Sequence, residues 1–98
     1  MNDTKASTSV VIRHSQGLHA RPALLIARRA NQFVSRIELI KGHVRADAKS
    51  VLHVMTLAAE SGTCLKIEAE GPDAEGAVAA LAELIGGDFE AADETHEG

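Results

Sequence analysis

Apolar and polar residues follow two different periods along the chain, which predict strands in some segments and helices in others. A period of two, or a run of β-branched residues, predicts a strand, whereas apolar residues three or four positions apart predict one face of a helix. The predicted strands span residues 9–14, 34–41, 43–48 and 63–70. The predicted helices span residues 20–32, 51–59 and 72–85. The predicted order is therefore β-α-β-β-α-β-α.

This order predicts an α+β fold in which one four-stranded antiparallel sheet carries three helices on one face. In the strand that follows the turn at Gly42, we expect Val44, Ala46 and Ala48 to face the core. The outward positions of the strands carry Arg, Glu, Lys and Asp. The opposite face of the sheet is therefore expected to be open to water.

The length of 98 residues suits a single domain. The predicted elements place this domain at residues 9–88, with a flexible tail at residues 1–8 and an acidic flexible tail at residues 89–98. Phe33 and Phe89 are the only aromatic residues, so the core must be aliphatic. Neither a signal peptide nor an apolar run of membrane-spanning length is visible, which favours a cytoplasmic protein with no membrane insertion.

Charge is distributed unevenly between the two halves of the chain. Residues 1–50 hold nine Lys or Arg and three Asp or Glu, a net charge of +6, whereas residues 51–98 hold one Lys and eleven acids, a net charge of −10. The sum of these two values is the net charge of −4. The basic half predicts either a positive patch facing an acidic partner or a phosphate, or surface charge scattered without function.

The heptapeptide GLHARPA, residues 17–23, places His19 where the first helix begins, with Pro22 in its first turn. Unpaired N–H groups at a helix start attract anions and disfavour a protonated imidazole. A neutral, nucleophilic ring and a cradle for an anion thus coincide, and Arg21 can add a forked donor. This combination predicts a phosphoryl-accepting site; the alternative is an ordinary surface or capping histidine.

The sequence shows no motif for a metal site, a nucleotide-binding loop or a disulfide. His14, His43, His53 and His96 lack metal-ligand spacing, and no glycine-rich nucleotide loop occurs. Cys64 is the only cysteine, so no disulfide or zinc cluster can form within the chain. We therefore expect neither a metal nor a cofactor, and any phosphate must come from a donor protein or a small phosphate compound.

The segment GLHARPA resembles the active-site signature of HPr, the family of histidine-containing phosphocarriers of the bacterial phosphotransferase system. The resemblance continues in AKSVLHVMTLAAESGT and in LKIEAEGPDAEGAVAALAELI, and it covers roughly residues 9 to 88. It implies an open-faced β-sandwich with the element order predicted above. It also implies a cytoplasmic monomer that carries a phosphoryl group without turnover of its own.

The resemblance implies a role for each residue of the signature. His19 matches the histidine that enzyme I, charged by phosphoenolpyruvate, phosphorylates on Nδ1, and that then passes the group to an enzyme IIA domain. Arg21 matches the arginine that positions the phosphoryl group. Gly17, Ala20 and Pro22 complete the phosphate-binding loop and the start of the helix.

Ser50 heads the second predicted helix and is a good N-cap residue. The resemblance matches it to the serine that HPr kinase/phosphorylase modifies in some bacteria. It also matches Val51, Leu52 and Met55 to a patch that docks partners, which Leu24 could extend. VLHVM departs here from the glycine-containing IMGVM that is common in kinase-regulated members, with His53 at the third position.

Two alternatives to a sugar-branch carrier compete. The ending LIGGDFEAADE resembles that of nitrogen-branch relatives, so the chain could serve a regulatory phosphotransfer chain. It could also be mainly a co-regulator that binds partners through the Ser50 helix. Binding of nucleic acid is not expected, because the predicted strands lack the aromatic residues on which bases stack.

Overall fold

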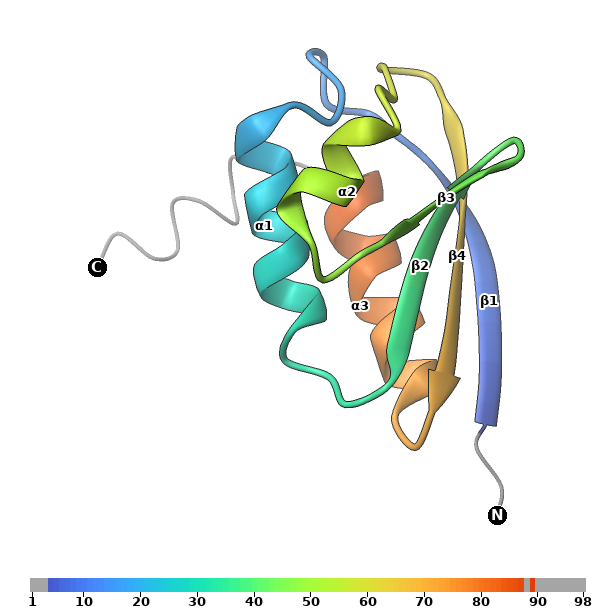
Figure 1. The fold of residues 1–98 in the computed structure, drawn as a ribbon. Coiled ribbons are helices and arrows are strands. Elements are labelled where there is room, and N and C mark those ends of the chain that lie inside the picture. Colours follow the sequence, from blue (N-terminus) through green and yellow to red (C-terminus); the bar gives the residue numbers. More distant parts are fainter. Residues whose placement is uncertain (1–3, 88, 90–98) are drawn as a thin grey trace.

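The computed structural model describes residues 4–87 and residue 89. These residues form the strands β1 (Thr4–Val11), β2 (Arg36–Lys41), β3 (Val44–Asp47) and β4 (Cys64–Gly71) and the helices α1 (Ala20–Ala30), α2 (Val51–Thr56) and α3 (Ala74–Gly86). The strands pair in the order β1-β4-β2-β3, and every pair is antiparallel. The three helices cover one face of this sheet (Figure 1). The predicted α+β open-faced sandwich is confirmed.

The period of each segment explains the side that it buries. In β4, Leu65, Ile67 and Ala69 face the helices and are almost fully buried, because side chains alternate across a strand. In α3 the buried positions recur every three or four residues, as expected for a helix that packs along one stripe. They are Ala74, Ala77, Val78, Leu81 and Ile85. The core is therefore almost entirely aliphatic.

Hydrogen bonds hold the start of α3 against the loop that leads into β2. The carboxylate of Asp73 accepts from the backbone N–H groups of Val34 and Ser35, both at 2.9 Å, and from the hydroxyl of Ser35 at 2.6 Å. These donors, with the Ser35 hydroxyl first, lower the pKa of Asp73 to about 2. The charged form of Asp73 thus contributes to the stability of the fold.

The first strand is longer at its start than the sequence predicts. Residues 4–8, which we expected to be part of a flexible tail, pair in register with Gly71 through Ile67 of β4. The segment TKAST has no aliphatic residue larger than alanine. It can still form a strand, because an edge strand need only partly bury one of its sides. At its other end the strand stops at Val11, three residues earlier than expected.

Two further expectations about burial are wrong. Val44 was expected to face the core, but it is 49% exposed because it follows the turn of the hairpin at its tip (Figure 1); Ala46 and Ala48 are buried as predicted. Phe89 was assigned to the acidic tail, yet it is 3% exposed and packs against the core. The other residues of the two predicted tails, 1–3 and 90–98, lie outside the described residues.

The second helix is shorter than predicted, because it ends at Thr56 and not near residue 59. Ala58 has a φ of +48°, a left-handed conformation that cannot continue a helix. Within the described residues, none of the helices is long and apolar enough to cross a membrane.

Candidate functional site

His19 is the N-cap residue of α1. Its backbone is extended, and its carbonyl oxygen accepts the first hydrogen bond of the helix from the N–H of Ala23 at 2.9 Å. Its side chain makes no capping hydrogen bond, and the residue is exposed. An N-cap side chain commonly turns back to bond the helix. Here the imidazole instead stays accessible at the positive end of α1.

The loop before His19 is fastened to the segment that follows α2. The N–H of Leu18 donates to the carbonyl oxygen of Ala59 at 2.9 Å, and the Leu18 side chain is buried. Gly17 has a φ of +69°, and a Cβ at this position would lie 2.5 Å from the same oxygen. Only glycine therefore fits both the backbone conformation and the space.

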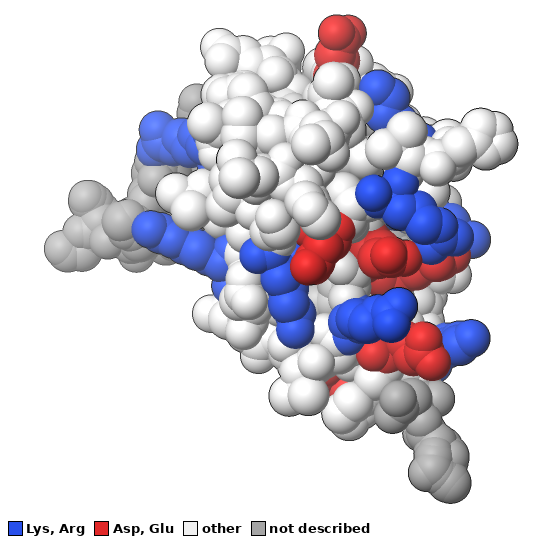
Figure 2. All heavy atoms as spheres, viewed as in Figure 1, with Lys and Arg blue, Asp and Glu red and all other residues white. Residues whose placement is uncertain are grey.

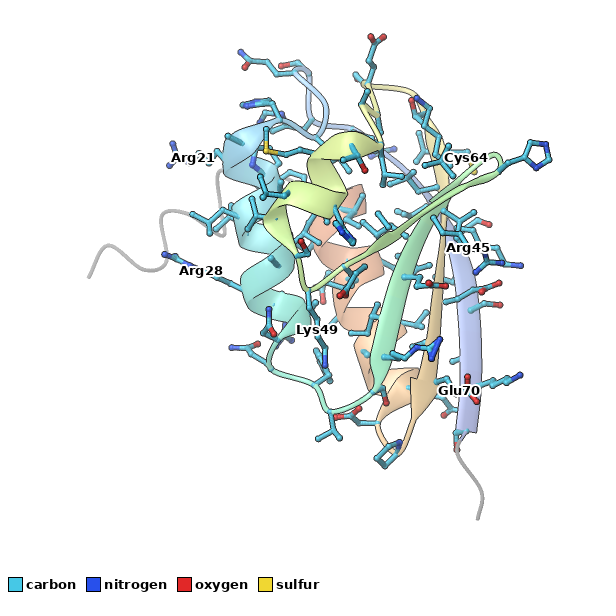
Figure 3. All side chains as sticks on the ribbon, in the orientation of Figure 1. Arg21, Arg28, Arg45, Lys49, Cys64 and Glu70 are labelled. Carbon is cyan, nitrogen blue, oxygen red and sulfur yellow. The ribbon has the colours of Figure 1, made fainter. Side chains whose placement is uncertain are left out.

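The remaining residues of the predicted loop lie in the first turn of α1. Pro22 is buried and contributes no N–H, which suits a turn whose N–H groups have no partner inside the helix. Ala20 is exposed, and its N–H has no partner within the described part of the chain. Arg21 is exposed and projects outward from this end of α1 (Figure 3). The structure therefore gathers the five signature residues at one helix start.

A second histidine stands beside His19. The ring centroids of His14 and His19 are 5.9 Å apart, with an angle of 54° between the ring planes. The ring of His14 also makes an edge-to-face contact with the ring of Phe89, with centroids 5.6 Å apart. From the sequence, His14 was considered only as a metal ligand. The available signal was the segment HSQGLH, in which a glycine allows a tight turn between the two histidines.

Ser50 caps α2 as predicted. Its hydroxyl oxygen accepts a hydrogen bond from the N–H of His53 at 3.2 Å, and its backbone is extended. The residue is half-buried. Ser50 therefore stabilises the start of α2 as its N-cap residue.

The apolar residues assigned to a docking patch fall into two groups. Leu52 is 74% exposed, and Leu24 and Met55 are each 39% exposed. Val51 is partly buried and packs against the core. The first three lie on α1 and α2, which pack side by side (Figure 1). We call Leu24, Leu52 and Met55 the apolar patch.

Arg side chains are spaced along α1, whereas acidic and basic side chains mix on the sheet (Figure 2). On the sheet, Arg45 bonds Glu38 at 2.8 Å and Glu68 at 3.0 Å, and Lys66 bonds Glu68 at 3.1 Å. Part of the positive charge of the first half is thus balanced across the strands. Arg21, Arg28 and Arg29 place further positive charge of this half on the helix that begins at His19.

A recess of about 440 Å³ lies on the open face of the sheet, between side chains of all four strands. Its walls include Lys5, Arg36, Arg45 and Glu70 and contain no residue of α1 or α2. His19 is instead exposed at the start of α1, outside this recess. Such a site suits a side chain that enters the active site of another protein, since it does not enclose a small molecule.

Comparison with known proteins identifies the family. The family model for the "PTS HPr component phosphorylation site" matches residues 6–86. The chain is 40% identical over 82 residues to the phosphocarrier protein HPr of Treponema pallidum (strain Nichols), covering 84% of this chain and 93% of the relative. It is 38% identical over 76 residues to the HPr-like protein Crh of Bacillus subtilis (strain 168), covering 78% and 89%.

A solved structure agrees with this result. The phosphocarrier protein HPr from Bacillus anthracis str. Ames matches with a TM-score of 0.79 at 37% identity, covering 83% of this chain and 96% of that one. The fold, the signature residues and the sequence identity therefore all indicate the same family. The chain belongs to the HPr family, the phosphocarrier proteins of the phosphotransferase system.

Proposed function

We propose that His19 carries the phosphoryl group, which it accepts from enzyme I charged by phosphoenolpyruvate and passes to an enzyme IIA domain. The observation that carries this proposal is the exposed imidazole of His19 at the N-cap of α1, which makes no capping bond. A ring in this position can enter a partner's active site while its backbone stays within the helix start.

The transfer needs only a neutral ring nitrogen. A lone pair on Nδ1 of His19 attacks the phosphorus, the P–N bond forms, and the bond to the donor breaks with its electron pair left on the donor. Transfer to the acceptor reverses these roles, so the chain is regenerated and has no turnover of its own. The N–H groups at the start of α1 and the guanidinium of Arg21 stabilise the negative phosphoryl group without enclosing it.

Partners would contact the surface around this helix start. The apolar patch supplies hydrophobic surface next to the arginines of α1, and Met55 can adapt its shape to more than one partner. An acidic partner surface complements this charge. We therefore expect enzyme I and the IIA domain to use overlapping parts of α1 and α2.

A mainly regulatory role through Ser50 is the second candidate. The similarity to the HPr-like protein Crh favours it, and so does the position of Ser50 beside the exposed Leu52. Phosphorylation of Ser50 by HPr kinase/phosphorylase would add a charge of about −1.5 to −2 next to the apolar patch. The added charge would repel an acidic partner.

Labelling separates the two candidates. With enzyme I and labelled phosphoenolpyruvate, the wild-type chain should incorporate one acid-labile phosphoryl group, and His19→Ala should incorporate none. His43→Ala removes an exposed histidine from the turn between β2 and β3 and should label fully. Full labelling of His19→Ala would refute the assignment. Acid-stable label introduced at Ser50 by a kinase, with none at His19, would support the regulatory role.

A further inference from the structure

His14 has the geometry of a second functional imidazole in the phosphoryl site. It precedes the loop that ends at His19, and the two ring centroids are 5.9 Å apart. A hydrogen bond between N–H and oxygen joins atoms about 2.9 Å apart, so an N–H of a ring this close is within reach of a phosphoryl oxygen carried by His19. His14 is half-buried, so its ring is also held in place on one side.

The local backbone selects the tautomer of His14. The N–H of Gln16 donates to Nδ1 of His14 at 3.3 Å, which requires a lone pair on that nitrogen. The neutral ring therefore carries its proton on Nε2. This Nε2–H has no acceptor within the described part of the chain, so a donor remains available.

The contacts of His14 restrict the movement of its ring. Phe89, which is 3% exposed, packs its ring against that of His14 in an edge-to-face arrangement, with centroids 5.6 Å apart. The carbonyl oxygen of His14 accepts from the N–H of Gly17 at 3.0 Å, which closes the turn towards His19. A donor that is oriented before the ligand arrives costs little entropy when it is used.

We propose that His14 is a positioning residue that donates a hydrogen bond from Nε2–H to the phosphoryl group on His19. This inference rests on the proposed function, because it requires phosphorylation of His19. The hydrogen bond exists only in the phosphorylated state, so it shifts the phosphoryl equilibrium toward this chain. No covalent bond to His14 forms.

A competition experiment measures this shift directly. Equal amounts of the wild-type chain and His14→Phe are mixed with catalytic enzyme I and phosphoenolpyruvate sufficient for half of the total protein. Enzyme I exchanges the phosphoryl group between the two forms until equilibrium, and mass spectrometry gives each phosphorylated fraction. Phenylalanine keeps a flat ring against Phe89 but lacks both nitrogens. We expect the equilibrium to favour the wild type about fivefold, the effect of one partly exposed hydrogen bond.

Two further variants separate donation from packing. His14→Gln retains an N–H donor near the position of Nε2, and we expect it to recover most of the shift. His43→Phe applies the same change to an exposed turn histidine and should compete equally with the wild type. Equal phosphorylation of His14→Phe and the wild type would overturn the inference while leaving the proposed function intact. Absence of label at His19 in every form would overturn the proposed function itself.

Nitrogen NMR of the wild type gives an independent test that does not depend on how any variant folds. We expect neutral His14 to be the Nε2–H tautomer, and its Nε2 resonance to move on phosphorylation of His19 while that of His43 stays in place. An Nδ1–H tautomer, or an unmoved Nε2 resonance in the phosphorylated chain, would contradict the role.

Discussion

Gly17 and Ala59 meet so closely that position 17 has no room for a side chain. A Cβ on Gly17 would lie 2.5 Å from the carbonyl oxygen of Ala59, and this same oxygen accepts the N–H of Leu18. The backbone that carries His19 is thus held against the segment after α2. The position of the His19 ring depends on this contact.

Gly17→Ala should therefore destabilise the fold and impair phosphorylation together. Gly42→Ala is a matched control, since Gly42 has a similar φ of +61° but a Cβ added there would meet nothing within 4 Å. We expect Gly42→Ala to cost about 1 kcal/mol of unfolding free energy for its backbone conformation alone, and Gly17→Ala to cost about 2–3 kcal/mol. Urea unfolding measures both values. Equal costs would show that the contact with Ala59 relaxes without penalty.

Arg21→Ala should slow phosphoryl transfer from enzyme I by about tenfold, because one charge-assisted hydrogen bond to the phosphoryl group is lost. Arg28→Ala removes an equal charge from the last turn of the same helix. It should weaken the encounter with enzyme I without changing the rate of the bound complex. Single-turnover kinetics at saturating enzyme I distinguishes these effects, and equal rates for the two variants would contradict the role of Arg21.

Substitutions at Ser50 can separate its capping role from an effect of charge. Asn and Asp cap helices about as well as Ser does, whereas Ser50→Ala should lose about 1 kcal/mol of stability. Ser50→Asp and Ser50→Asn should therefore unfold at similar urea concentrations. If a negative charge here repels partners, only Ser50→Asp should raise the KM of enzyme I for this chain. A similar rise for Ser50→Asn would assign the effect to shape and not to charge.

Leu52→Ser should raise the KM of enzyme I by about tenfold with little loss of stability, because burial of one leucine at an interface contributes about 1.5 kcal/mol or more. Val34→Ser is the control, since Val34 is 76% exposed, comparable to the 74% of Leu52, but lies in the loop that leads into β2. Steady-state labelling measures both variants. An unchanged KM for Leu52→Ser would remove it from the docking surface.

We expect Asp73 to contribute to the free energy of unfolding at neutral pH and to lose this contribution in acid. Its folded pKa of about 2 lies below the ordinary value of 3.8, so its stabilisation is complete above about pH 4 and is lost as the pH falls through 2. Ser35→Ala removes the strongest donor and should move this loss to higher pH. Acid unfolding followed by circular dichroism measures the shift. Coincident acid profiles for the wild type and Ser35→Ala would contradict it.

The sequence was sufficient to predict the sheet, the helices and the position of His19 at the start of α1, because these depend on local periodicity and on a helix start. The alternation of Leu65 and Ile67 with charged residues and the proline in the first turn of α1 are signals within short windows. The start of β1 was missed because an edge strand of Thr, Lys and Ser buries too little to leave an apolar pattern.

The contacts of His14 could not be predicted by the same means. The ring reaches His19 through a turn whose closure depends on the left-handed Gly17, and it meets Phe89 from the opposite end of the chain. No spacing rule links those positions. The exposure of Val44 likewise depends on how far the helices extend over the hairpin, which is a property of the assembled fold.

The segment after α2 connects the sheet to the loop that carries His19. Lys41 of β2 donates from Nζ to the carbonyl oxygen of Leu57 at 3.0 Å, and two residues later Ala59 holds the loop of His19. Hydrogen bonds therefore link the sheet, the segment after α2 and the loop of His19 to one another. Successive enzymes can then recognise the same preformed shape and need not remodel it at each encounter.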